Sequence, residues 1–192
     1  MLRFNLSPIF LSIIIFIVLF IYLRKKRNKD LTYMAFWTLF YIYIVNVIRL
    51  TQFPVFIVDF PFEYNLQDFI QLKPESPLGY NLETSLLNVL LTIPFGFGLA
   101  FLIKMNFKKA LFLTVCFSLT LEILQLSAHL FLPGNDRMVD VNDVIYNTLG
   151  GIIGYLLFLL FGLIFKLILS KYELEDNSIL DHIRSSVNTN YK

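Results

Sequence analysis

The fold class follows from residues 110–132, which read ALFLTVCFSLTLEILQLSAHLFL. A helix of this length crosses a hydrocarbon core of about 30 Å, because each residue adds about 1.5 Å of rise. Within the run, Ser118, Glu122, Gln125 and His129 are spaced i, i+4, i+7 and i+11. Their spacing places all four within roughly 60° of one helix face. This pattern predicts a membrane-spanning helix whose polar stripe faces other protein rather than lipid.

Glu122 is the most informative residue in this stripe. It lies about 18 Å along the helix from Ala110, just past the middle of the span. An ionised carboxylate at that depth costs at least about 2.5–3.5 kcal/mol against lipid. The Glu122 side chain is therefore expected to face protein, a water-filled cavity or a cation, or to be protonated.

The rest of the chain has the composition of a membrane protein, with 57% hydrophobic and 17% aromatic residues among 192. Four further apolar runs are long enough to span: Leu6–Leu23, Leu31–Leu50, Thr84–Ile103 and Val144–Leu169. We predict an all-α, polytopic bundle of about five transmembrane helices in the cell membrane. The lipid bilayer is the expected partner, and no nucleic acid is expected.

Charged residues alternate in sign between the successive connections of this bundle. Basic residues occupy 24–29, 104–109 and 166–171, whereas acidic residues dominate 59–83 and 136–143. Because cytoplasmic connections of membrane proteins are enriched in Lys and Arg, the N-terminus is predicted outside and the C-terminus inside. The order of charges around the first run also argues for a retained helix rather than a signal peptide.

We divide the chain into a first helix with its basic loop (1–30), a four-helix membrane domain (31–169) and a polar tail (170–192). Residues 59–83 are predicted to lie at the outer interface, either as a loop or with a short amphipathic piece near 66–72. In the tail, Ile179, Leu180, Ile183 and Val187 could line one side of a short helix, although disorder is equally compatible with the composition.

A second polar stripe begins the last run. Asp140, Asp143 and Asn147 are spaced i, i+3, i+7. The two aspartates stand where carboxylates cap free N–H groups and favour the helix dipole, so Asp143 is read either as a cap or as part of a site. The glycines at 150, 151 and 154 are expected to let a neighbouring helix approach closely.

The run at 84–103 contains Pro94, which predicts a kink because proline frees the carbonyl of Leu90. Asn88, Thr92 or a water molecule could bond that carbonyl. Asn88 and Thr92 share one side of the helix. A bent helix beside two polar stripes is expected to enclose a polar cavity.

Arg137 lies in the turn between the two striped helices. It could form a salt bridge with Asp140 or Glu122. It could equally grip a phosphate or carboxylate, because guanidinium binds both in a bidentate fork.

At these residues the sequence resembles the VanZ family of small membrane proteins, which is named for a teicoplanin-resistance determinant. The matching motifs are Asn88…Pro94-Phe95-Gly96, Glu122-x-x-Gln125 and Arg137-x-x-Asp140-x-x-Asp143-x-x-x-Asn147-x-x-Gly150, within about residues 30–165. The resemblance implies a bacterial envelope protein that lowers susceptibility to teicoplanin and other lipoglycopeptides.

Three functions remain open from the sequence. The first is a protein without enzymatic activity whose outward-facing polar cavity engages a lipid-linked cell-wall precursor or a lipoglycopeptide. The second is an intramembrane enzyme that acts on a lipid phosphate or headgroup with a divalent metal, and the third is a small transporter or proton-coupled channel. No residue is assigned as catalytic, no metal-ligand spacing is diagnostic, and no cofactor is expected. The candidate ligand-binding residues are Asn88, Glu122, Gln125, His129, Arg137, Asp140, Asp143 and Asn147.

Overall fold

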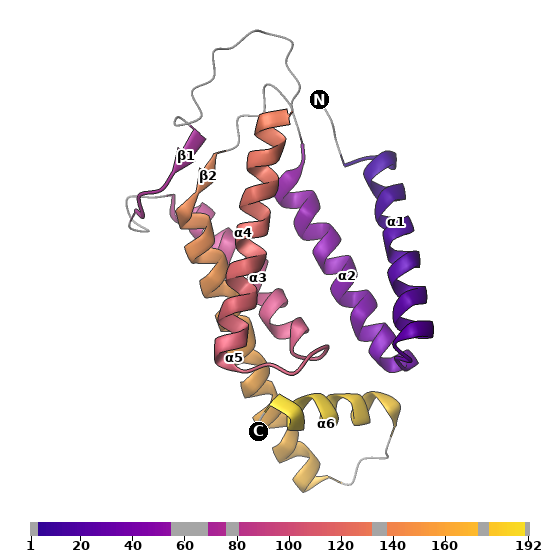
Figure 1. The fold of residues 1–192 in the computed structure, drawn as a ribbon. Coiled ribbons are helices and arrows are strands. Elements are labelled where there is room, and N and C mark those ends of the chain that lie inside the picture. Colours follow the sequence, from indigo (N-terminus) through magenta and orange to yellow (C-terminus); the bar gives the residue numbers. More distant parts are fainter. Residues whose placement is uncertain (1–3, 55–68, 76–80, 132–137, 173–176, 191–192) are drawn as a thin grey trace.

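The computed structural model describes residues 4–54, 69–75, 81–131, 138–172 and 177–190. The helices are α1 (Leu6–Ile21), a π-helical extension η1 (Tyr22–Lys26), α2 (Leu31–Gln52), α3 (Leu82–Leu99), α4 (Phe107–Phe131), α5 (Val141–Lys171) and α6 (Ser178–Asn190). Two short strands, β1 (Ile70–Gln71) and β2 (Val139–Asp140), complete the described elements. Figure 1 shows α1 to α5 running side by side, with α6 lying across one end of the bundle.

Five of these helices are long and apolar enough to cross a membrane: α1 with η1, α2, α3, α4 and α5. The predicted helical bundle of about five spans is therefore confirmed. The third span was placed too far along the chain, because the helix begins at Leu82 rather than Thr84 and ends at Leu99 rather than Ile103. A tight turn follows, in which the Phe101 amide donates to the Gly98 carbonyl at 3.2 Å.

The two ends of the bundle differ in chemistry. One end, called the strand end here, carries β1 and β2 together with the start of α5. The other, called the basic end, carries the α1–α2 connection, the α3–α4 connection and α6 (Figure 1). The side of a membrane that each end faces stays a prediction.

Helix α4 turns its polar stripe inward. Its buried residues are Ala110, Thr114, Ser118, Leu121, Glu122, Gln125 and His129. Large apolar residues such as Phe112, Leu119 and Ile123 are exposed on the opposite side. A lipid-facing apolar surface around a polar interior is the arrangement expected of a membrane bundle, and Cys116 lies on the exposed side.

Helices α3 and α5 form the tightest contact, and glycines make it possible. A side chain at Gly96 would overlap the Gly151 carbonyl, and one at Gly154 would overlap the Ile93 carbonyl. Gly150 is equally close to the Val89 carbonyl. The predicted role of the glycines in close helix packing is confirmed: Gly150 and Gly154 face the backbone of α3, and Gly151 faces the Thr114 side chain of α4.

Helix α3 continues through Pro94, and a side chain of α2 donates a hydrogen bond to it near this residue. The Tyr43 hydroxyl of α2 donates to the Leu91 carbonyl at 2.8 Å. The Thr92 hydroxyl contacts other carbonyls, so it is not the partner expected for Leu90. A side chain from α2 therefore supplies polar contact at the proline.

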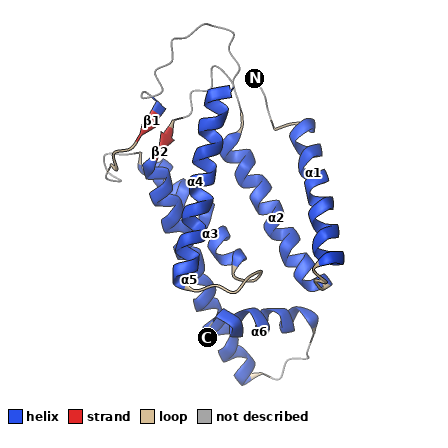
Figure 2. Ribbon diagram, in the orientation of Figure 1, coloured by secondary structure: helices blue, strands red, loops and turns tan. Residues whose placement is uncertain are grey.

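The strands were not anticipated from the sequence. They form a parallel pair in which Ile70 lies opposite Val139 and Gln71 opposite Asp140 (Figure 2, red). Each strand is only two residues long, and the partners are distant in the chain, so neither carries a periodic pattern. Most of the connection at 59–83, including residues 66–68 of the possible amphipathic piece, lies outside the described residues.

The tail forms a helix, which decides between the two alternatives left open by the sequence. Val187 is buried on α6, and Leu180 and Ile183 pack against the same core, whereas Ile179 is exposed. The Asn190 side chain donates to the Ala100 carbonyl at 3.1 Å and accepts from the Met105 amide. Helix α6 thus satisfies backbone groups that the end of α3 would otherwise leave free.

Replacing Gly96 with alanine is expected to destabilise the bundle by about 1–3 kcal/mol, because the new methyl group must displace the α5 backbone. Thermal unfolding of purified protein in detergent measures this effect. Gly98→Ala is the matched control, since a methyl group there meets only the Phe40 ring, at 3.0 Å. Equal stability losses in the two variants would contradict the packing argument.

Candidate functional site

Buried and half-buried polar side chains gather where α3, α4 and α5 meet near the strand end. They come from α3, the inward face of α4, strand β2 and the first turns of α5. The group, called the polar site here, consists of Asn88, Thr92, Ser118, Glu122, Gln125, His129, Asp140, Asn142, Asp143 and Asn147.

Glu122 lies at the centre of the polar site and is only 5% exposed. Its Oε2 accepts a hydrogen bond from the Asp140 amide at 3.2 Å. The carboxyl groups of Asp140 and Asp143 are close enough to interact electrostatically with it. The two polar stripes predicted from the sequence therefore meet around three acidic side chains.

Asp140, rather than Asp143, is the N-cap of α5. Its Oδ1 accepts hydrogen bonds from both the amide and the side-chain nitrogen of Asn142, each at 2.8 Å. Asp143 lies one turn further along, and its Oδ1 accepts from the Asn88 side chain at 2.6 Å. The capping role considered for Asp143 thus belongs to Asp140, and Asp143 links α5 to α3.

A second set of hydrogen bonds ties Asn147 to both neighbouring helices. Its Nδ2 donates to the Ser118 hydroxyl of α4 at 3.0 Å. Its main-chain carbonyl accepts from the Thr92 hydroxyl of α3 at 2.7 Å. In a low-dielectric interior such bonds hold three helices in one relative position.

Two buried acceptor atoms in the polar site have no hydrogen-bond partner among the described residues. They are Oε1 of Gln125 and Oδ1 of Asn147. The Gln125 amide group points its Nε2 toward the Thr51 carbonyl of α2, at 3.4 Å. An unsatisfied buried acceptor costs about 1–3 kcal/mol, so these atoms are expected to meet a donor from water or a ligand.

The remaining candidates lie at the strand-end side of the polar site or beyond the described residues. The His129 ring packs against Phe69, next to β1, with ring centroids 4.0 Å apart. Arg137 lies outside the described residues, and its salt-bridge and anion-grip interpretations both stay predictions. Among the predicted residues, hydrogen bonds join Asn88 to Asp143, the Asp140 amide to Glu122, and Asn147 to Ser118.

Sequence reasoning missed Asn142, which is 1% exposed and central to the site. Its Oδ1 accepts from the Glu75 amide at 2.9 Å, which fastens the segment after β1 to the start of α5. Asn142 falls between the stripe positions 140, 143 and 147, so helical periodicity did not select it. The Asp-x-Asn spacing, which is typical of a capping turn, was the available signal.

Within the described ranges, no three His, Cys, Asp or Glu side chains are arranged to hold one metal ion. Oδ1 of Asp140 is also committed to two hydrogen bonds from Asn142. Whether Glu122, Asp140 and Asp143 recruit a divalent cation stays a prediction.

A bundle of five membrane-length helices with a buried polar interior defines a multi-pass integral membrane protein. A family model described as VanZ/LLP1 matches residues 8–162. The chain belongs to the VanZ/LLP1 family, as the motifs around the polar site predicted. The match begins inside α1, so the family pattern extends further toward the N-terminus than those motifs. No curated protein and no solved structure matches the chain.

Asn142→Ala is expected to release the segment after β1, because it removes the acceptor of the Glu75 amide. A hydrogen bond of about 1 kcal/mol corresponds to roughly fivefold faster amide exchange at Glu75. Hydrogen–deuterium exchange in micelles measures this rate. Asn46→Ala, which removes a bond within α2 on an exposed surface, is the control, and unchanged exchange in Asn142→Ala would refute the anchoring role.

Proposed function

We propose that the polar site binds the hydrogen-bond-donating headgroup of a lipid-linked cell-wall precursor or of a lipoglycopeptide. Occupancy of this site would lower susceptibility to teicoplanin. The observation that carries the proposal is the set of buried acceptors without partners, Gln125 Oε1 and Asn147 Oδ1, beside the Glu122 carboxyl group.

The balance of donors and acceptors selects the kind of ligand. Glu122, Asp140 and Asp143 are acidic, and the two amide oxygens add further acceptors. A phosphate group placed among them would be repelled. Sugar hydroxyls, peptide N–H groups and ammonium groups are instead complementary, and glycopeptides and cell-wall precursors carry such donors.

The protein has an apolar groove that suits a lipid chain attached to such a headgroup. The groove lies between α1 and α2 and has a volume of about 400 Å³. Phe4, Pro8 and Phe53 line it near the strand end. Since Thr51 of α2 also accepts from Gln125, the groove and the polar site share one helix segment. The proposed ligand would place its chain in the groove and its headgroup at the polar site.

The proposal requires the strand end to face the exterior, where cell-wall precursors and glycopeptides meet. Basic residues support this orientation, since Arg24, Lys26, Lys104 and Lys109 lie in or beside the connections at the opposite end. Cytoplasmic connections are enriched in such residues.

Cysteine labelling tests the orientation. In a Cys116→Ser background, Glu83→Cys at the start of α3 is expected to react with a membrane-impermeant maleimide in intact cells. Lys26→Cys and Ser178→Cys are expected to react only after permeabilisation. All three positions are exposed, so the reactivity of each cysteine with the maleimide reports the side of the membrane on which that cysteine lies. The reverse pattern would place the polar site at the cytoplasmic side and overturn the proposal.

Expression in a susceptible bacterium tests the function. The wild-type chain is expected to raise the minimum inhibitory concentration of teicoplanin. Glu122→Gln keeps an acceptor for the Asp140 amide but loses the carboxylate, and is expected to return the value to that of the empty vector.

Thr120→Val is the matched control on the exposed side of α4, and is expected to behave as wild type at equal expression. No change in teicoplanin susceptibility with the wild-type chain would eliminate the proposed role. Repeating the measurement with a glycopeptide that carries no lipid chain distinguishes recognition of the headgroup from recognition of the chain.

A further inference from the structure

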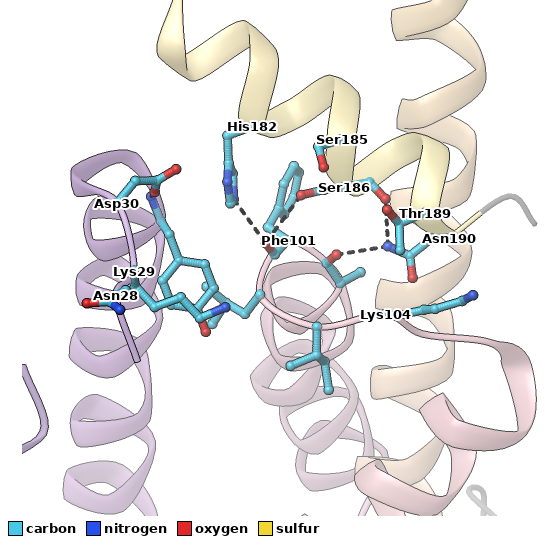
Figure 3. Close-up of a pocket in the computed structure, with 14 residues that line it drawn as sticks. Asn28, Lys29, Asp30, Phe101, Lys104, His182, Ser185, Ser186, Thr189 and Asn190 are labelled. Carbon is cyan, nitrogen blue, oxygen red and sulfur yellow. Dashed lines mark hydrogen bonds between the residues drawn. The ribbon is translucent and has the colours of Figure 1, made fainter. Parts of the chain in front are cut away.

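A polar cavity lies at the basic end, far along the bundle from the polar site and sharing no residue with it. Its volume is about 350 Å³. The walls come from the residues that begin α2, the α3–α4 turn at 100–104 and one side of α6. Figure 3 shows α6 lying over that turn, with the start of α2 on the opposite side of the opening.

Helix α6 is held rigidly against the turn. The Ser186 hydroxyl donates to the Phe101 carbonyl at 3.3 Å, and the His182 Nε2 lies 3.0 Å from the same oxygen. Asn190 completes the set through the Ala100 carbonyl (Figure 3). The cavity wall is therefore built from specific contacts, which leave Ser185 and Thr189 as further hydroxyl groups along the opening.

Two lysines line the cavity, Lys29 just before α2 and Lys104 at the end of the turn. Lys29 is half-buried, unlike the exposed basic residues at 24–27 before it. Its ammonium group lies 4.2 Å from the centroid of the Tyr33 ring, which also lines the cavity. Asn28 adopts the left-handed conformation with φ 48° in the turn before α2, and the Lys29 carbonyl accepts from the Arg24 side chain at 2.6 Å. Lys104 is the last residue of the turn, and its side chain extends away from Lys29 (Figure 3).

Acidic groups near the cavity are already engaged. The Asp30 side chain caps α2 by accepting from the Tyr33 amide at 2.6 Å. On α6, Asp181 pairs with Arg184 at 3.3 Å. Asp30 lines the cavity, and the other polar side chains there present ammonium, hydroxyl and amide groups.

We propose that this cavity binds a phosphate-bearing anion. Lys29 and Lys104 supply charge, and Ser185 and Thr189 supply hydrogen bonds, a combination that suits phosphate oxygens. The cavity lies where the apolar spans end, so the headgroup of an anionic phospholipid can reach it, as basic pockets at membrane surfaces commonly allow. A soluble phosphate has the same chemistry, and the two sources are separated experimentally.

Native mass spectrometry of the full chain in a neutral detergent provides the test. The probes are short-chain phosphatidylglycerol, short-chain phosphatidylcholine and inorganic phosphate. Phosphatidylglycerol is expected to bind more tightly than phosphatidylcholine. Lys29→Gln is expected to weaken its binding about fivefold, whereas Lys29→Arg retains it. Ser185→Asp, at an exposed position, is expected to weaken binding through like-charge repulsion without disturbing the core.

Lys108→Gln is the matched control, because it removes one positive charge at the same end from an exposed residue outside the cavity. If Lys29→Gln and Ser185→Asp selectively lose phosphatidylglycerol binding, the result supports a lipid headgroup as the ligand. Binding of inorganic phosphate with the same sensitivity supports a soluble ligand. Equal weakening in Lys108→Gln, or no weakening in either cavity variant, overturns the proposal.

Discussion

Direct backbone contact between α3 and α5 governs the arrangement of this protein. Lipid offers no hydrophobic gain for bringing apolar helices together, so close packing and interhelical hydrogen bonds must supply the association energy. Gly96, Gly150 and Gly154 remove the side chains that would separate the two helices. At this separation the short side chains of Asn88 and Thr92 reach across to α5. A larger residue at these glycines would lengthen both contacts.

The polar site depends on this packing in a second way. Once α3 and α5 are in contact, α4 covers their junction, with Thr114 directly over Gly151 and Ser118 bonded to Asn147. The inward face of α4 then places Glu122 against the first residues of α5. Each helix therefore satisfies polar groups of another, and among the described residues of the polar site Gln125 Oε1 and Asn147 Oδ1 are left without a donor.

The two ends of the bundle have opposite chemical character. At the strand end, acidic and amide oxygens prevail, and a two-residue parallel pairing closes the connection onto α5. At the basic end, α6 caps backbone carbonyls at the end of α3 and forms one wall of a cation-lined cavity. Helix α3 runs from one end of the bundle to the other. It therefore positions groups both in the polar site and in the cavity at the basic end. The two proposed ligands differ accordingly, one rich in donors and the other anionic.

Run length and spacing within single helices were sufficient to predict five spans, the inward stripe of α4 and the packing glycines of α5. These features are local, since they depend on periodicity and on the cost of polar groups in lipid. Only the tertiary structure assigned the cap to Asp140, revealed Asn142 as a buried anchor, and showed that Tyr43 of α2 bonds the Leu91 carbonyl near Pro94. Those contacts join residues from different elements, and a periodicity along one helix contains no information about which neighbour lies opposite it. The distance between facing backbones, set by the glycines, decided which polar atoms could pair.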